Sequence, residues 1–174
     1  KGAELSSIKS KESNTEYLWQ AHPDHWGRHS CILFPVIGCV IDDSIIIDDV
    51  KYPMLKHGIL RDREFELTER SQDRLVFTMS SDADTLKMYP FDFTFKAIYT
   101  LEESICKIRY EVSTDGVVPI PFNIGGHPAF NCPLDKDKKR SDYSLIFNES
   151  EDQSSPIIDQ NGMISPELQL VLDN

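Results

Sequence analysis

The sequence predicts an all-β fold, either a sandwich or a barrel, from two observations. Residues 91–99 alternate apolar and polar side chains, and residues 106–112 repeat this alternation after a short polar link at residues 102–104. Because side chains alternate between the two faces of a strand, this period of two predicts a half-buried antiparallel hairpin. No segment has the period of an amphipathic helix, and the aromatic row within residues 91–99 is more typical of a buried core face than of a sugar platform.

The other elements are predicted from short apolar segments that lie between turn residues. Further strands are expected at residues 3–8, 44–48, 74–80 and 143–147, with a short apolar piece at residues 17–20. Pro35 interrupts the apolar run at residues 31–38, which therefore predicts an edge or bulged strand. Loops are expected at residues 21–30, 51–61, 135–140 and 149–156.

Length and charge limit the classes of function. The 174 residues are enough for one domain, and we expect residues 1–174 to form a single β-sandwich domain. The formal net charge of −11 argues against nucleic acid or an anionic membrane as a partner. No apolar run approaches the roughly 18–20 residues that a membrane-spanning helix needs.

Cysteine usage indicates the compartment. Cys31, Cys39, Cys106 and Cys132 show no CxxC spacing, so we interpret them as buried or free thiols in a reducing compartment. The first residues lack the apolar core of a signal peptide. The expected location is the cytoplasm.

The candidate site centres on residues 123–130, where His127 follows two glycines and precedes Pro128. Adjacent glycines permit either a positive φ or a close approach of the backbone to another group, and proline fixes the next φ. We therefore expect a stiff turn at a strand end that holds an imidazole able to transfer a proton near neutral pH.

A second histidine and two arginines stand in similarly constrained surroundings. His57 and Arg61 flank an apolar Gly-Ile-Leu segment, and Arg28 precedes the apolar run at residues 31–38. A lone histidine more often satisfies local hydrogen bonds than performs catalysis. Two histidines beside glycines, with two arginines near in sequence, favour a polyhydroxyl or anionic ligand, although the residue pattern leaves the structural interpretation open.

Metal binding is a weaker interpretation. His22, His25, His29 and Cys31 have spacings that zinc accepts, but no distal pair of ligands completes the set. The acidic pairs at residues 42–43 and 48–49 lack the alternating pattern of a calcium loop, so solvated turn acids are favoured.

Several segments together carry a resemblance to a known family. They are residues 2–8, 16–20, 26–38, 52–53, 57–61, 89–91 and 123–130. In this order they resemble the aldose 1-epimerase (galactose mutarotase) family, and most of all its LacX-like branch. The resemblance covers residues 2–134 and its motifs are specific in combination, whereas residues 135–174 match less clearly.

The resemblance implies a large antiparallel β-sandwich with a sugar pocket, and an isomerase that interconverts the α and β anomers of a hexose. In such enzymes a carboxylate base takes the proton of the C1 hydroxyl, and a histidine acid protonates the ring oxygen. His127 matches that acid, His57 the pocket histidine near the ring oxygen, and Arg28 the substrate-binding arginine. No metal or organic cofactor is implied, and we expect a monomer or homodimer whose partner is a small sugar.

The match has departures. Gly27 and Cys31 stand where lysine and proline are expected, and Ile59-Leu60 replaces a Phe-Ala type pair; these changes affect packing more than chemistry. The family's base is a glutamate well downstream of the histidine motif. Three glutamates are available, at positions 149, 151 and 167, but none lies in a matching segment. We therefore assign no base and expect that residues 1–174 represent the N-terminal part of the family fold.

Two other functions stay open. One is a mutarotase for hexose 6-phosphates, in which Arg61 matches an arginine that helps to hold an anionic substituent. The other is a carbohydrate-binding β-sandwich without catalysis, which would have no use for a proton donor beside paired glycines.

Overall fold

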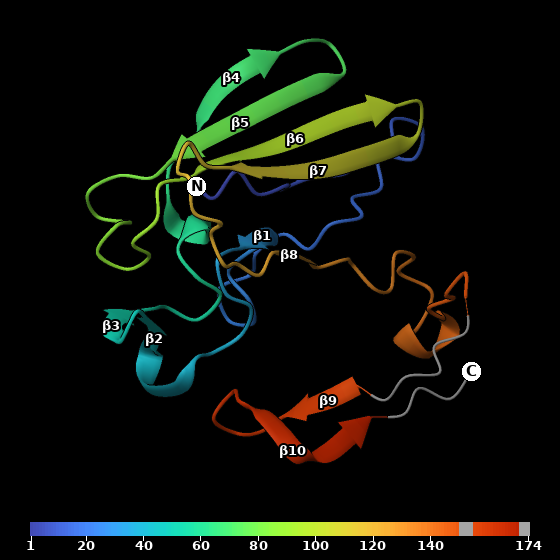
Figure 1. The fold of residues 1–174 in the computed structure, drawn as a ribbon. Helices are drawn as coiled ribbons and strands as arrows, with labels where there is room; N and C mark the ends of the chain where they lie inside the picture. Colours follow the sequence, from blue (N-terminus) through green and yellow to red (C-terminus); the bar gives the residue numbers. More distant parts are fainter. Residues whose placement is uncertain (150–154, 171–174) are drawn as a thin grey trace. The chain divides into compact units, whose positions relative to one another are not determined.

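The protein, seen here in a computed structural model, is described at residues 1–149 and 155–170. These residues contain ten strands, three single-turn 3-10 helices and no α-helix (Figure 1). The chain folds into two compact units. The first unit contains Lys1–Leu5 and Ser30–His127, and the second contains Ser6–His29 and the residues from Pro128 onward.

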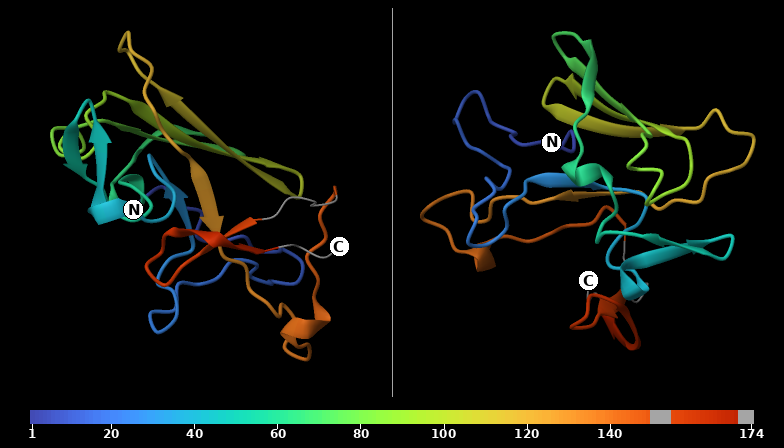
Figure 2. Two further views of the ribbon diagram at one scale, coloured as in Figure 1. Left: turned by 60° about the horizontal axis from the view of Figure 1, so that its bottom comes forward. Right: turned by 90° about the vertical axis from the view of Figure 1, so that its left-hand side faces the viewer.

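The largest sheet of the first unit contains four antiparallel strands in the order β4-β5-β6-β7. Their bounds are Glu66–Arg70 for β4, Arg74–Ser80 for β5, Thr94–Glu102 for β6 and Ile105–Ser113 for β7. Both views of Figure 2 show these green to olive strands side by side as one sheet. The predicted hairpin and the predicted strand at residues 74–80 are confirmed.

Strand β4 was not predicted. All of its side chains are exposed, so its sequence has no apolar face to produce an alternating signal. The strand exists because its backbone pairs with β5, with Glu66 opposite Thr78 and Arg70 opposite Leu75.

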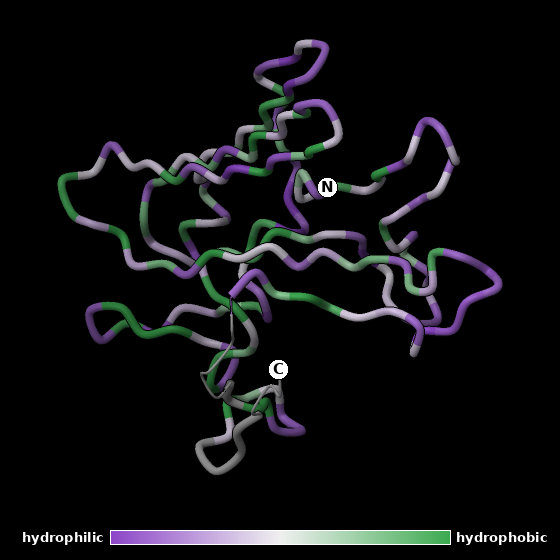
Figure 3. Tube along the Cα trace, turned by 90° about the vertical axis from the view of Figure 1, so that its right-hand side faces the viewer, coloured by the Kyte–Doolittle hydropathy of each residue, from purple (hydrophilic) through white to green (hydrophobic). Residues whose placement is uncertain are grey.

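The hydrophobic core of this unit lies against the inner face of β6. Phe93, Phe95, Ala97 and Tyr99 are all buried, which confirms the aromatic row as a core face. The ring of Phe34 is fully buried beside them, with ring centroids 5.2 Å from Phe93 and 5.4 Å from Phe95. In Figure 3 hydrophobic and hydrophilic residues follow one another along the chain trace, and several of its outermost bends are hydrophilic.

A second pair of strands positions the candidate site. Strand β1 (Ser30–Leu33) is hydrogen-bonded to β8 (Gly125–Pro128), and every residue of β1 is buried. The strand predicted at residues 31–38 is confirmed only in its first half. Phe34 forms an isolated bridge to Gly58, and the regular strand ends before Pro35, which has no backbone N–H to donate.

Strands β2 (Ser44–Ile47) and β3 (Val50–Pro53) form a separate antiparallel hairpin. Asp48 and Asp49 connect them, both with positive φ, as a type I′ hairpin turn requires. The strand predicted at residues 44–48 is confirmed. The loop predicted at residues 51–61 is wrong at its start, where β3 pairs with β2, and at its end, where the 3-10 helix η2 (Leu60–Asp62) begins.

Two predicted strands are wrong. Residues 3–8 form no strand, because the Glu16 carboxylate rather than a ladder accepts the backbone N–H of Ile8. Residues 143–147 also form no strand, and Leu145 and Ile146 are each 90% exposed. An apolar run that has no partner strand to pair with does not form a strand.

The remaining loops are confirmed in part. The loop at residues 21–30 ends where β1 begins, and the exposed charged loop at residues 135–140 runs into η3 (Arg140–Asp142). Within the loop predicted at residues 149–156, residues 150–154 lie outside the described ranges, and Ser155 already belongs to a strand. That strand, β9 (Ser155–Ile158), pairs antiparallel with β10 (Ile164–Leu170), and neither was predicted.

The four cysteines all lie in described residues, and none of them forms a disulfide in this structure. Cys31 is buried. The remaining helical segment, η1 (Ile41–Asp43), is as short as η2 and η3, and no helix of the described residues is long and apolar enough to cross a membrane.

We expect that any self-association of the chain through the exposed apolar residues near the turn of the β6–β7 hairpin is weakened when these residues are replaced. Leu101 and Ile108 lie on the same face of the sheet as buried Tyr99 but are 49% and 39% exposed. Burying an aliphatic side chain contributes about 1.5–3 kcal/mol, so Leu101→Thr with Ile108→Thr should weaken self-association at least about tenfold. Sedimentation at several protein concentrations measures this. The control is Lys107→Thr on the opposite face, and equal association in all three proteins would contradict the prediction.

Candidate active site

His127 lies on strand β8, and this placement corrects the expected turn. Gly125 and Gly126 have no positive φ, and β8 is extended through Pro128. The sequence allows two roles for these glycines, a positive φ or a close approach of the backbone to another group. The structure shows the second role. The imidazole is held by a strand that pairs with fully buried β1.

The two glycines bring other side chains against the backbone beside His127. A Cβ added at Gly126 would lie 3.4 Å from the hydroxyl oxygen of Tyr110 on β7. A Cβ added at Gly125 would lie 3.2 Å from the terminal methyl group of Ile37. Glycine therefore allows β8 to pack closely against neighbours on both β7 and the segment after β1.

His57 is fixed by its backbone and by its ring. It has a φ of 67°, in the left-handed region that a non-glycine residue rarely occupies. Its backbone N–H donates to the carbonyl of Gly38 at 2.9 Å, and the N–H of Gly38 donates back to His57 Nδ1 at 3.0 Å. These reciprocal bonds hold the imidazole against the backbone of Gly38, which lies nineteen residues earlier in the sequence.

The bond from Gly38 has a chemical consequence for His57. Nδ1 accepts a hydrogen bond, so it carries a lone pair rather than a proton. The neutral ring that satisfies this bond has its proton on Nε2, as the surrounding hydrogen bonds define the tautomer. His57 is thus prepared to donate a hydrogen bond through Nε2 rather than to exchange a proton at Nδ1.

The structure brings the two histidines together. The ring centroids of His57 and His127 lie 5.8 Å apart with an interplanar angle of 65°, an edge-to-face arrangement. Both residues belong to the first compact unit, and His57 is half-buried whereas His127 is exposed. The expected proximity is confirmed, and the catalytic roles stay a prediction.

The two arginines have different environments. Arg61 lies in η2 of the first unit, where its side chain is 20% exposed and its Nε lies 3.5 Å from the carboxylate of Asp62. Arg28 belongs to the second unit and is half-buried. Their membership of a sugar site stays a prediction.

The candidate metal ligands and the three candidate glutamate bases do not form a site in the described residues. Among the described residues, no group of three or more histidine, cysteine or acidic side chains could hold a metal ion. Glu149 is exposed, Glu151 lies outside the described ranges, and Glu167 lies on β10. Glu149 and Glu167 belong to the second unit, whereas the two histidines belong to the first, and the general base stays unassigned.

Two positioning residues were missed in the sequence. Gly38 ends the apolar run at residues 31–38, and a glycine at that point is the signal for the positive φ of 81° that it adopts. Tyr89 carries no signal of its own in the sequence, but its hydroxyl donates to the carbonyl of Pro121 at 2.9 Å. That bond anchors the segment that leads into β8, together with the N–H of Asn123, which donates to the carbonyl of Pro35 at 2.8 Å.

Tyr89→Phe tests this anchor. Burial raises the pKa of Tyr89 to about 12, so the folded state favours the neutral phenol. This contribution to stability is complete below the ordinary tyrosine pKa of 10.0 and is lost as the pH rises toward 12. We expect Tyr89→Phe to cost about 1 kcal/mol at neutral pH and to reduce the alkaline loss of stability. Urea unfolding at neutral and alkaline pH measures both effects; Tyr17→Phe is the control, and an unchanged alkaline profile in Tyr89→Phe would contradict the prediction.

The described structure is that of an almost entirely β protein with a paired-histidine site between a strand and a glycine turn. The sequence model of the aldose 1-epimerase family matches residues 1–159. The chain therefore belongs to the aldose 1-epimerase family.

Individual relatives agree with this assignment. Two LacX proteins of Lactococcus lactis subsp. lactis, plasmid and chromosomal, are each 37% identical in a 161-residue alignment that covers 89% of this chain and 54% of the relative. A galactose mutarotase related enzyme from Lactobacillus acidophilus matches with a TM-score of 0.79 and 33% identity, over 81% of this chain and 47% of that one. A galactose mutarotase-like protein from Lactobacillus casei has a TM-score of 0.74 and 39% identity, over 78% and 46%.

These similarities confirm the expected LacX-like relationship and the all-β, galactose mutarotase-like fold class. The chain spans about half the length of the curated relatives that it matches. Its activity, substrate and partners are therefore proposals.

Proposed function

We propose that this chain carries the proton-donating side of an aldose 1-epimerase that interconverts the α and β anomers of a hexose. The observation that carries the proposal is the His57–His127 pair, with ring centroids 5.8 Å apart. Membership of the aldose 1-epimerase family supports the same chemistry.

The proposed reaction moves two protons and breaks one C–O bond. A general base removes the proton of the C1 hydroxyl while the bond between C1 and the ring oxygen breaks, giving an open-chain aldehyde. Protonated His127 donates its proton to the ring oxygen. Rotation about the C1–C2 bond and closure, with both protons returned, give the other anomer.

The two histidines have different tasks in this reaction. An imidazole can both give and take a proton near neutral pH, which suits exposed His127 to the role of the acid. The Nε2–H of His57 donates a hydrogen bond to the ring oxygen or an adjacent hydroxyl, because Gly38 occupies Nδ1. No metal or organic cofactor is needed for breaking O–H and hemiacetal C–O bonds.

Optical rotation of freshly dissolved α-glucose or α-galactose tests the proposal. In a weakly catalytic buffer, the protein should accelerate the approach to the anomeric equilibrium above the spontaneous rate, in proportion to its concentration. Sugar binding without acceleration would replace the proposal with a non-catalytic carbohydrate-binding protein. If the protein neither binds the sugar nor accelerates its anomerisation, the epimerase and the carbohydrate-binding interpretations are both overturned.

A further inference from the structure

Strand β7 forms one edge of the four-stranded sheet (Figure 1), and no strand of the described residues pairs with its outer side. It pairs with β6 over nine consecutive residues without a bulge, and it contains no proline. Strand β4, at the other edge, has an irregular register between Leu67 and Glu69. Bulges and prolines keep an edge strand from pairing further, so β4 is protected whereas β7 keeps a long regular edge.

The outer side of β7 carries backbone groups that are directed toward a further strand. In β6 the N–H of Leu101 donates to the carbonyl of Asp73, on the β5 side, so the groups of the next residue, Glu102, point toward β7. Glu102 is paired with Ile105, and the direction of the backbone groups alternates along each strand. The groups that point away from β6 are therefore those of Cys106, Ile108, Tyr110 and Val112. None of these four residues makes a backbone hydrogen bond outside the strand ladders of the described residues.

The charged side chains of β7 lie on the face of the sheet that points away from the core. Tyr110 lies on the core face, where its ring centroid is 5.8 Å from that of Phe95. Lys107, Arg109 and Glu111 alternate with the core-facing residues and so lie on the other face. Arg109 Nη2 is 2.8 Å from Glu111 Oε1, and the Arg109 side chain is 74% exposed. Such an exposed ion pair contributes little to the stability of the chain, and both charged groups are accessible to a second strand that pairs with β7.

We propose that β7 pairs antiparallel with β7 of a second copy of this chain, in a register centred on Tyr110. In this register Arg109 of each copy lies directly opposite the partner's Glu111. Opposite charges at directly opposed positions stabilise a strand pair, whereas like charges destabilise it. The register also sets Ile108, which is 39% exposed, opposite the partner's Val112. The outward backbone groups of these core-facing residues then pair across the interface.

Charge selects this register from its neighbours. A register centred on Arg109 would set the two Arg109 side chains opposite each other, and one centred on Glu111 would do the same to the two carboxylates. A register centred on Ile108 would set Lys107 opposite the partner's Arg109. Main-chain hydrogen bonds give an added strand its affinity, and side chains give it specificity. The complementarity of Arg109 and Glu111 therefore identifies a second copy of β7 as the occupant of this edge.

Charge reversal in the whole chain tests both the pairing and its register. Arg109→Glu sets an acid opposite the partner's Glu111, and Glu111→Arg sets a cation opposite the partner's Arg109, so each variant should dimerise at least about tenfold more weakly. The double variant Arg109→Glu/Glu111→Arg retains the net charge of −11 and restores opposite charges, so it should dimerise like the native chain. An equimolar mixture of the two single variants should form a mixed dimer. Sedimentation equilibrium at several protein concentrations measures each of these associations.

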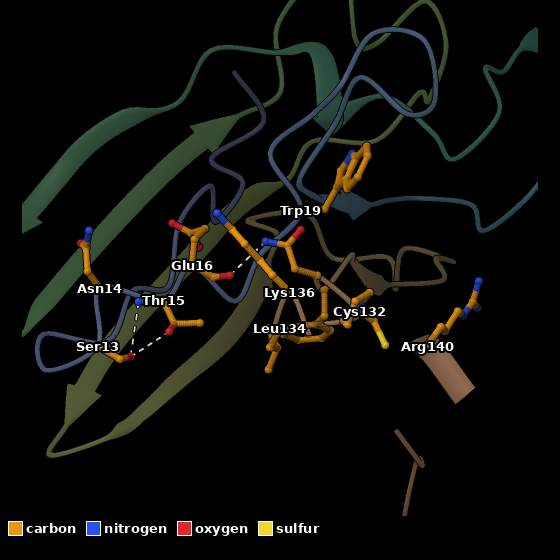
Figure 4. Close-up of a pocket in the computed structure, with 12 residues that line it drawn as sticks. Ser13, Asn14, Thr15, Glu16, Trp19, Cys132, Leu134, Lys136 and Arg140 are labelled. Carbon is orange, nitrogen blue, oxygen red and sulfur yellow. Dashed lines mark hydrogen bonds between the residues drawn. The ribbon is translucent and has the colours of Figure 1, made fainter. Parts of the chain in front are cut away.

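Two control variants make the same change of charge as Arg109→Glu at other places. Arg70→Glu lies on the exposed strand β4. Arg140→Glu lies in the second unit, at one end of the groove between residues 13–19 and 130–140 that Figure 4 shows. Both variants should dimerise like the native chain.

Amide hydrogen exchange locates the interface in the same samples. The backbone N–H groups of Ile108, Tyr110 and Val112 should exchange more slowly as the protein concentration rises, because they become bonded to the partner strand. The N–H of Arg109 is directed toward β6, so its exchange should not depend on concentration.

Four results would overturn the proposal. A native chain that stays monomeric up to its solubility limit has no such interface, and a dimer without protection of the three outward amides uses another surface. Equal weakening in Arg109→Glu and both controls would show that only net charge matters. If the double variant dimerises as weakly as the single variants, the register centred on Tyr110 is wrong.

Discussion

Replacing His127 by alanine is expected to slow the proposed anomerisation by about 10²–10⁴-fold, the usual contribution of a positioned general acid. Alanine cannot donate a proton to the ring oxygen, so the leaving alkoxide would have to be protonated by water. The extended conformation of β8 does not require histidine, because its pairing with β1 uses the backbone. The variant should therefore fold normally and fail in the chemical step.

Two further variants make this result specific. His22→Ala removes an exposed histidine of the loop at residues 21–30 and should leave the rate unchanged. His57→Asn retains a neutral donor and a residue type that tolerates a positive φ, so it should affect KM more than kcat. A rate in His127→Ala equal to that of the native chain would remove His127 from the role of acid.

The sequence predicted those strands whose two faces differ in polarity. The β6–β7 hairpin could be predicted because one face of β6 is buried in the aromatic core and the other is polar. Strand β4 could not, because it lies at the edge of the sheet with all of its side chains exposed and so has no buried apolar face. Residues 143–147 show the converse case, in which an apolar run has β propensity but no partner strand.

The candidate site was predictable in composition but not in geometry. The glycine beside each histidine was visible in the sequence, and the proximity of the two rings was inferred through the family resemblance. The orientation of His57 depends on its bonds to Gly38 and on the bridge between Phe34 and Gly58, which are tertiary contacts. No local pattern specifies which distant backbone group will occupy Nδ1.

Gly58→Ala is expected to destabilise the fold by more than about 4 kcal/mol, which is exceptional for a single substitution. Gly58 has a φ of 80°, and an added Cβ would lie 1.9 Å from the carbonyl oxygen of Phe34. The same oxygen accepts the N–H of Ile59 at 2.8 Å, so it cannot move away without breaking that bond. Because the Phe34 ring is in the centre of the core, relief of the clash would disturb core packing as well.

Two other glycines distinguish the stability cost of the steric clash at Gly58 from the cost of backbone strain at a positive φ. Gly38 has a φ of 81° with nothing within 4 Å of an added Cβ, so Gly38→Ala should cost only about 1–2 kcal/mol. Gly27 has neither a positive φ nor a neighbour within 4 Å, so Gly27→Ala should change stability by less than about 0.5 kcal/mol. Urea unfolding of the three variants should give the order Gly58, Gly38, Gly27 in loss of free energy. If Gly58→Ala were no worse than Gly38→Ala, the close contact between Phe34 and Gly58 that supports His57 would not exist in solution.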